Sequence, residues 1–399
     1  MNIDNLIDNE RTIFLQTYNR LPIIIESARG NIIWDEDGTE YRDFIAGLAV
    51  NILGHSHPAV VDAAIRQTYK YMHVSNYFYQ RIQIEFAMAL TQISGYDRVF
   101  LTNSGTEANE GAIKLCRSWG FDKDKTEIIA FTGGFHGRTY GPLSLTERPQ
   151  YKEKMGPFLN NMRIVEYNNS QALEEAVSEK TAGVLFEFIQ GEGGLCSVTD
   201  EFIETICRLK DKYDFLIITD EIQTGIGRTG KFMASEHWNI KPDIATIAKG
   251  IGGGLPLGAI LTREHLANVW KIGNHGSTFG GNAVACATGL AVINELQRGI
   301  MRNSLVVSDY FMLHLQAIAE DFPNCVEEIR GKGMMLGIVL KFEASILCRI
   351  LLEEKKIITN ATAGNVLRLL PPLITTKEDI ICFVLAIREC LQNLFTEII

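Results

Sequence analysis

Two ionisable residues lie where buried strands are expected to end. Asp220 follows the apolar run Phe215–Thr219, and Lys249 follows the run Ile244–Ala248 and precedes the glycine-rich residues 250–254. Ligands of open α/β sheets bind beyond the carboxyl ends of the strands, so both side chains are candidates for one shared site. The spacing from residue 220 to residue 249 suits neighbouring strands, because a strand–helix–strand unit takes roughly 30 residues.

The lysine is the more reactive candidate of the two. A lysine held at the end of an apolar strand is disfavoured as a cation, so its pKa falls and its amine becomes nucleophilic. The alternative is a lysine whose ammonium reaches the surface, and for Lys249 considered alone this is the commoner case. Amine chemistry is therefore predicted only in combination with other residues.

The segment Asn103–Asn109 is a candidate phosphate site. It follows the apolar run Arg98–Leu101 and opens a helix expected over Glu110–Ser118. The free N–H groups and the positive dipole end of a helix start favour an anion. The alternative is an ordinary helix start capped by a serine or threonine hydroxyl, and this segment alone favours that alternative.

Two further segments carry candidate ligand-binding residues. Phe135 and Arg138 follow the apolar run Glu127–Phe131, and the polar loop His275–Asn282 contains Ser277 and Thr278. An arginine can hold a substrate carboxylate through two hydrogen bonds, a phenylalanine can lie on a flat ring, and hydroxyls can reach a phosphate. A surface arginine, a core phenylalanine and a plain turn are the alternatives, and each is the commoner case in isolation.

Alternating apolar and amphipathic segments place these residues within an α/β fold. From about residue 98 the short apolar runs fit buried parallel strands joined by helices, which predicts a large α/β domain in the middle of the chain. A smaller α+β domain is expected from both ends, with short strands in 23–50 around the turn Asp35–Gly38. The remaining apolar runs are Gly183–Ile189 and Leu257–Leu261. Helical patterns cover 58–72, 80–93, 288–298, 304–320, 344–354 and 377–395, and short strands are expected near 334–340 and 366–370.

Composition and charge exclude several classes of protein. The 399 residues are 46% hydrophobic with a formal net charge of -10, which argues against a nucleic-acid or membrane-surface role. The sequence shows no membrane-spanning stretch, and the acidic segment Met1–Glu10 does not resemble a signal peptide. The eight cysteines form no Cys-x-x-Cys pair, which favours reduced thiols and a cytoplasmic protein. The eight histidines show no zinc-binding spacing, so no metal is expected.

Together, these segments resemble one family, the class III aminotransferases. The resemblance runs from about residue 17 to the C-terminus. It implies a fold-type I, pyridoxal-phosphate-dependent transferase and a homodimer. The implied large domain spans 59–290, and 1–58 and 291–399 build the small domain. The matching motifs are Ser104–Ala108, Phe135–Thr139, Glu187–Gly194, Asp220–Gly230 and the Lys249 loop.

The resemblance implies a role for each residue that would hold the cofactor. Lys249 carries pyridoxal 5′-phosphate as a Schiff base and moves the substrate proton. Asp220 keeps the pyridine nitrogen protonated, so that the ring is an electron sink. Gln223 lies near the phenolic oxygen of the ring. Gly105 and Thr106 hold the phosphate.

The family pattern also assigns residues to the substrate and to a second subunit. Thr278 is expected to reach the phosphate of the partner subunit's site, and Phe135 to stack on the cofactor ring. Arg138 grips a substrate carboxylate. Glu192 and Arg368 form an ion pair that opens when glutamate brings a second carboxylate.

Within the class, the chain resembles the N-acetylornithine aminotransferases most, in residues 46–55, 73–76 and 359–373. This implies transfer of the terminal amino group of N2-acetyl-L-ornithine to 2-oxoglutarate. The products are N-acetyl-L-glutamate 5-semialdehyde and L-glutamate, a step of arginine biosynthesis. The alternatives are transaminases of succinylornithine, ornithine or 4-aminobutyrate, a glutamate 1-semialdehyde aminomutase, and a non-catalytic protein that kept the fold. Phe188, Ala283 and the loop Thr146–Pro149 depart from the family pattern.

Overall fold

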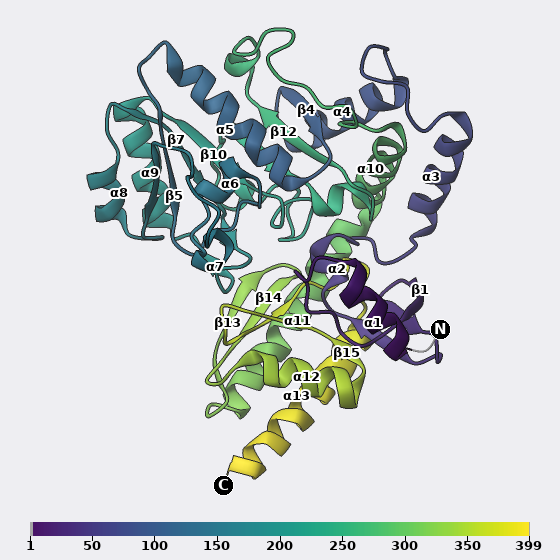
Figure 1. Ribbon diagram of the computed structural model, residues 1–399. Coiled ribbons are helices and arrows are strands. Elements are labelled where there is room, and N and C mark those ends of the chain that lie inside the picture. Colours follow the sequence, from purple (N-terminus) through teal and green to yellow (C-terminus); the bar gives the residue numbers. More distant parts are fainter. Residues whose placement is uncertain (1–2, 399) are drawn as a thin grey trace.

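A seven-stranded sheet forms the centre of the larger part of the molecule in the computed structural model, which describes residues 3–398 (Figure 1). Strand β10 pairs in parallel with β7 and β11, and β5 pairs in parallel with β7 and β6. The prediction of an α/β fold with a mostly parallel sheet is confirmed. In spatial order the strands are β4 (Arg98–Thr102), β12 (Gly258–Thr262), β11 (Ile244–Ile247), β10 (Leu216–Asp220), β7 (Thr181–Phe186), β5 (Glu127–Phe131) and β6 (Met162–Val165).

One strand runs against the predicted direction. The apolar run Leu257–Leu261 is expected among the parallel strands, but β12 is antiparallel to both β11 and β4. Only residues 248–257 lie between β11 and β12, and they contain the short 3₁₀ helix η2 (Lys249–Gly252). A parallel crossover needs a dozen residues or more, so the chain turns back directly and β12 returns beside β11.

The strands are continuously apolar because helices cover both faces of the sheet. Ile128 and Ala130 of β5 pack into a cluster with α5 (Gly105–Phe121). Ile129 and Phe131, which point to the opposite face, pack with α8 (Ser170–Ala176) and α9 (Asp200–Tyr213). Beside β11 and β12, α10 (Ala283–Glu295) packs against α3 (Pro58–Lys70) and α4 (Arg81–Ser94).

Two helices begin earlier than the apolar periodicity predicts. The Ser104 hydroxyl accepts a hydrogen bond from the Glu107 N–H, so α5 begins at Gly105 rather than Glu110. The Asn282 side chain accepts from Val284 N–H in the same way, and α10 begins at Ala283. A polar cap satisfies the first N–H groups of a helix and extends it beyond its apolar repeat.

Segments from the two chain ends pack together below the central sheet (Figure 1). The Phe44 ring lies 6.1 Å from that of Phe311 and 4.8 Å from that of Phe383, measured between centroids. The predicted division at residues 58 and 290 stays a proposal, and its outer limits at residues 1 and 399 lie outside the described residues. The elements here are β1 (Ile25–Arg29), β2 (Ile32–Asp35), β3 (Glu40–Asp43), α11 (Met301–Asp321), β13 (Val326–Lys332), β14 (Met335–Leu340), α12 (Ala344–Lys355), β15 (Ile357–Ile358), β16 (Asn360–Thr362), β17 (Val366–Leu369) and α13 (Lys377–Ile398).

A buried arginine joins this smaller part to the loop after β10. Arg228 is 1% exposed and donates from Nη1 to the carbonyl oxygens of Met334, at 3.0 Å, and Pro371. Burial lowers the pKa of the guanidinium to about 9, and the charge of Asp43 opposes this shift. The contacts fix the position of the smaller part over the carboxyl edge of the sheet. The remaining elements are α1 (Ile3–Ile13), α2 (Ala46–Ala49), α6 (Tyr140–Ser144), α7 (Pro149–Lys152), β8 (Ile189–Gln190), β9 (Cys196–Ser197), the 3₁₀ helices η1 (Ala234–His237) and η3 (Glu264–Leu266), and the π-helix η4 (Leu296–Ile300).

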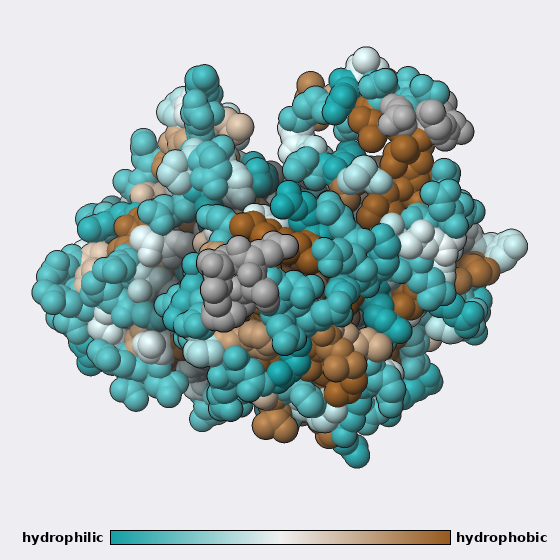
Figure 2. Space-filling model, turned by 90° about the horizontal axis from the view of Figure 1, so that it is seen from below, coloured by the Kyte–Doolittle hydropathy of each residue, from teal (hydrophilic) through white to brown (hydrophobic). Residues whose placement is uncertain are grey.

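Figure 2 shows one face of the molecular surface. Seen from below, hydrophilic residues cover most of the face, and hydrophobic areas interrupt it (Figure 2). In residues 3–398, none of the helices has both the length and the apolar character needed to cross a bilayer.

Candidate active site

A cavity of about 430 Å³ lies at the carboxyl ends of β10 and β11. Its lining comes from segments that are far apart in the sequence, which is typical of a site built on an open sheet. The cavity brings together most of the predicted site residues, namely Gly105, Thr106, Phe135, Arg138, Glu192, Asp220, Gln223 and Lys249.

Three predicted residues lie outside this lining. Arg368 is 2% exposed and lies behind Glu192, to which it is hydrogen-bonded. Ser277 accepts a hydrogen bond of 3.1 Å from Asn103, which does line the cavity. Thr278 is exposed on the neighbouring surface. The chain therefore brings Ser277 to the margin of the cavity and leaves Thr278 away from it.

Lys249 is held in an unusual backbone conformation. It begins η2 directly after Ala248 and has a φ of 49°, a left-handed conformation that costs free energy for a residue with a side chain. Desolvation lowers the pKa of its amine to about 8, and the charge of Arg368 acts in the same direction, while Glu192 opposes it. The amine is therefore partly neutral, and nucleophilic, near neutral pH.

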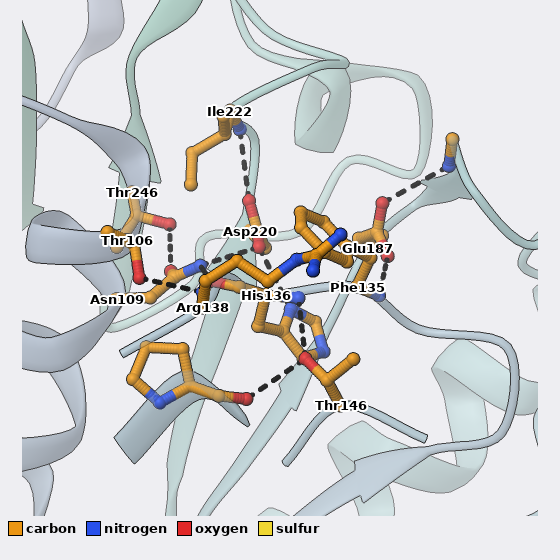
Figure 3. A network of polar contacts seen from close by, with 12 residues as sticks. Thr106, Asn109, Phe135, His136, Arg138, Thr146, Glu187, Asp220, Ile222 and Thr246 are labelled. Atoms are coloured by element: carbon orange, nitrogen blue, oxygen red, sulfur yellow. Dashed lines mark hydrogen bonds and ion pairs between the residues drawn. The ribbon is translucent and has the colours of Figure 1, made fainter. Parts of the chain in front are cut away.

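Three donors fix the carboxylate of Asp220, the last residue of β10 (Figure 3). Its Oδ2 accepts from Nδ2 of Asn109 at 2.7 Å and contacts Nδ1 of His136 at 2.9 Å. Its Oδ1 accepts from the Ile222 N–H at 3.1 Å. Burial disfavours the charged form of His136, but the hydrogen bond and the charge of Asp220 outweigh it and raise the imidazole pKa.

The start of α5 presents backbone donors to the cavity. Gly105 and Thr106 are the first residues of the helix, so the helix itself does not use their N–H groups. The Thr106 hydroxyl instead accepts from the N–H groups of Arg138 and Thr139, both at 3.2 Å. A Cβ on Gly137, which has a φ of 135°, would lie 2.3 Å from this hydroxyl, so only glycine permits the contact.

Arg138 is exposed at the cavity lining and lies over two aromatic rings. Its guanidinium carbon is 3.6 Å from the centroid of Tyr151 and 5.6 Å from that of Phe135. Within residues 3–398 the guanidinium forms no ion pair. It is thus a positioned cation with free donors, as a ligand carboxylate requires.

A second arginine is already paired. Nη1 of Arg368 lies 2.6 Å from Oε1 of Glu192, and it also donates to the carbonyl of Gly191 at 2.9 Å. Burial raises the pKa of the Glu192 carboxyl, but the charge of Arg368 outweighs it and the net shift is downward. The Glu192 carbonyl accepts from Thr362 at 2.8 Å and from Arg148. Arg148 belongs to the loop Thr146–Pro149, which differs from the family pattern.

Glu187 is a further residue of the site. It begins the motif Glu187–Gly194, but the sequence did not predict a role for its side chain. It lines the cavity and accepts from the N–H groups of Phe135 at 3.0 Å and Gly191 at 3.2 Å. Burial and the charge of Asp220 raise its carboxyl pKa to about 7. It joins the loop of Phe135 to the turn before Glu192. A carboxylate within a buried run is the only signal that could have identified it.

The residues present fit pyridoxal phosphate. The helix start suits a phosphate, the oriented Asp220 suits a pyridine nitrogen, and the amine of Lys249 suits an aldehyde. Phe135 and Ile222 add apolar surface to the same cavity. Asn109 and His136, which orient Asp220, were not predicted, because the sequence does not show that their side chains face it.

We expect Lys249 to capture an aldehyde at a lower pH than surface lysines do. Its amine is neutral above a pKa of about 8, so labelling by pyridoxal phosphate and borohydride should rise steeply from pH 7 to about 9 and then level off. Ordinary lysines should react only near pH 10. Peptide mass spectrometry across this pH series measures the labelling. Lys249→Ala is the control, and a main label on another lysine would contradict the assignment.

Comparison with known proteins agrees with this chemistry. The class-III aminotransferase family matches residues 13–391. The acetylornithine aminotransferase of Caldanaerobacter subterraneus subsp. tengcongensis is 42% identical over 379 residues, covering 94% of this chain and 96% of its own.

Solved structures share the fold over nearly the whole chain. The acetylornithine aminotransferase of Elizabethkingia anophelis is 32% identical with a TM-score of 0.87, covering 98% of this chain and 99% of its own. The ornithine aminotransferase of Toxoplasma gondii, whose active site is partly occupied by PLP, is 29% identical with a TM-score of 0.93, covering 99% and 95%. The resemblance in the motifs is confirmed: the chain belongs to the pyridoxal-phosphate-dependent class III aminotransferases.

Proposed function

We propose that this enzyme transfers the terminal amino group of N2-acetyl-L-ornithine to 2-oxoglutarate, a step of arginine biosynthesis in the cytoplasm. The products are N-acetyl-L-glutamate 5-semialdehyde and L-glutamate. The observation that carries the proposal is the presence of two different arginines: Arg138 lines the cavity without an ion pair to any described residue, and Arg368 lies behind the lining residue Glu192, with which it forms an ion pair. Relatives named acetylornithine aminotransferase support it, and so do eight cysteines free of disulfides, as in reducing compartments.

The bound cofactor supplies an aldehyde that accepts the amino group and a ring that stores electrons. Lys249 would provide the amine that holds this aldehyde and the base that moves the proton of the substrate carbon. Asp220 presents a fixed negative charge to the ring nitrogen. Gly105 and Thr106 bind the phosphate with backbone N–H groups. Gln223 offers its amide to the phenolic oxygen.

Two arginines let one cavity serve two different substrates. N2-acetyl-L-ornithine brings one carboxylate, which Arg138 binds through its free donors. 2-Oxoglutarate brings two, and the second replaces Glu192 on Arg368. Such a replacement costs little, because the buried arginine exchanges one carboxylate for another and is never left unpaired.

A half-reaction screen tests the substrate. We expect N2-acetyl-L-ornithine to remove the visible absorbance of the cofactor faster than ornithine or 4-aminobutyrate, by at least about tenfold in single-turnover kcat/KM. Succinylornithine differs from N2-acetyl-L-ornithine only in its acyl group, so the ratio of their kcat/KM values measures the selectivity for that group. Fastest bleaching by 4-aminobutyrate would exclude the proposal. Turnover of glutamate 1-semialdehyde without any keto acid would identify an aminomutase instead.

Glu192→Ala should affect the two half-reactions differently. The variant frees Arg368, so ground-state binding of glutamate and 2-oxoglutarate should tighten by about tenfold, which corresponds to ~1.4 kcal/mol. The N2-acetyl-L-ornithine half-reaction should gain nothing. Stopped-flow measurement of each half-reaction checks this. Glu264→Ala, which removes an exposed partner of Arg98 at 2.7 Å, is the control and should change neither. Equal loss in both half-reactions would leave the Glu192–Arg368 pair a purely structural contact.

The shared site of a homodimer is supported by the surface around Thr278. Asn76 donates to the carbonyls of Ser277 and Gly280, both at 3.1 Å, so residues 72–80 and 275–282 form one unit. This unit exposes aromatic side chains, which are enriched at protein interfaces. Their exposed fractions are 94% for Tyr77, 65% for Phe78, 100% for Tyr79 and 59% for Phe279. A second copy of the chain would cover this surface and receive Thr278 at its own phosphate site.

Mixed dimers test this arrangement. Lys249→Ala and Thr278→Glu chains should each be inactive alone, because one lacks the amine and the other repels the phosphate. Each heterodimer keeps one intact site of two, so equal mixing should restore roughly a quarter of wild-type activity. Activity is measured after subunit exchange, and native mass spectrometry establishes that heterodimers form. No recovery in a sample that contains heterodimers would place the whole site within one chain.

A further inference from the structure

Asn109 is a fully buried polar side chain to which the proposed mechanism gives no role. It lies one turn into α5, and its side chain is directed at the carboxyl ends of β10 and β11 (Figure 3). All its hydrogen-bonding atoms are used. Nδ2 donates to Oδ2 of Asp220 and to the carbonyl of His136, both at 2.7 Å, and Oδ1 accepts from the Thr246 hydroxyl at 2.7 Å.

The chemistry of these partners requires an amide. The carboxylate oxygen of Asp220 and the carbonyl of His136 are both acceptors, so only an N–H₂ group can satisfy both from one atom. The Thr246 hydroxyl supplies the proton that the amide oxygen needs. An aspartate of the same shape would place an acceptor against two acceptors. The amide orientation thus follows from the partners.

Two of these bonds, to Asp220 and Thr246, join three parts of the cofactor site. The start of α5 provides Gly105 and Thr106 to the phosphate, and Asn109 follows them by one turn, a rise of about 6 Å from Gly105. The same amide holds Asp220 at the end of β10. Through Thr246 it holds β11, which leads directly to Lys249. One side chain therefore sets the distance between the phosphate-binding helix, the carboxylate and the lysine strand.

We propose that Asn109 is a positioning residue that fixes the orientation of Asp220 toward the pyridine nitrogen and keeps α5 in register with β10 and β11. The proposal rests on the proposed role of Asp220. Thr246 is its support, because the hydroxyl orients the amide. His136 is the second donor to the same carboxylate oxygen, so loss of Asn109 leaves Oδ2 of Asp220 with a single donor, while the Ile222 N–H still holds Oδ1.

Asn109→Asp and Thr246→Val test the proposal through the cofactor itself. Asn109→Asp should weaken binding of pyridoxal phosphate by about ten- to hundredfold, the factor for one lost hydrogen bond to a charged group. The pH midpoint of the cofactor absorbance should shift by about one unit, and kcat should fall while KM changes little. Thr246→Val removes only the support of the amide, so it should give a smaller change in the same direction.

The matched control is Gln67→Glu. Gln67 is also a buried helical amide, but it donates at 3.1 Å to the carbonyl of Tyr71, at the end of α3. That variant should lower the unfolding midpoint without moving the affinity or the absorbance midpoint. Unchanged cofactor affinity and absorbance midpoint in Asn109→Asp would overturn the proposal. If that chain does not fold, the same result in Thr246→Val overturns it.

Asp220→Asn, measured in parallel, separates this proposal from the proposed function. A defective Asp220→Asn with normal Asn109 and Thr246 variants would refute only the positioning role. A normal Asp220→Asn would refute the role of the carboxylate, and the positioning role with it.

Discussion

The parallel pairing of β10 with β11 is the constraint on which the site depends. Asp220 pairs in register with Thr246, and the two strands end at the same edge of the sheet. The carboxylate and the amine of Lys249 therefore reach one cavity without any long-range adjustment of loops. The loops that complete the site have only to bring phosphate donors and arginines to an edge that the sheet has already defined.

Electrostatics within the cavity follow from this placement. The buried carboxyl groups of Glu187 and Asp220 and the half-buried one of Glu192 face the cations Lys249 and Arg368. The charge of Asp220 adds to burial in raising the pKa of Glu187, and the charge of Arg368 lowers the pKa of Glu192. Desolvation lowers the pKa of the Lys249 amine to about 8, while Arg368 stays paired with Glu192. Among the described residues, the cavity thus presents one arginine without an ion pair, Arg138, in front of a second, Arg368, that is paired with Glu192.

Most of the fold and the reactive centre could be predicted from the sequence. Asp220 and Lys249 end apolar runs of the length of a buried strand, and this local signal needs no knowledge of packing. The direction of β12 could not be predicted from its composition. An apolar run indicates that a strand is buried, but it does not indicate whether the strand pairs in parallel or antiparallel with its neighbours. Asn109 was missed because its role depends on which face of α5 meets the sheet. Thr278 lies on an exposed loop, and its contacts within one chain do not indicate which cavity its side chain would line.

The cavity is lined by segments that run from Val50 to Leu257, with Arg368 behind them. Such a site has a high contact order, and its parts meet only after the chain has closed its longest loops, at a large cost in entropy. A partly folded chain offers no complete binding surface, so the cofactor binds the native state alone and stabilises it by mass action. Bound pyridoxal phosphate therefore adds to the stability of the folded chain as well as to its chemistry.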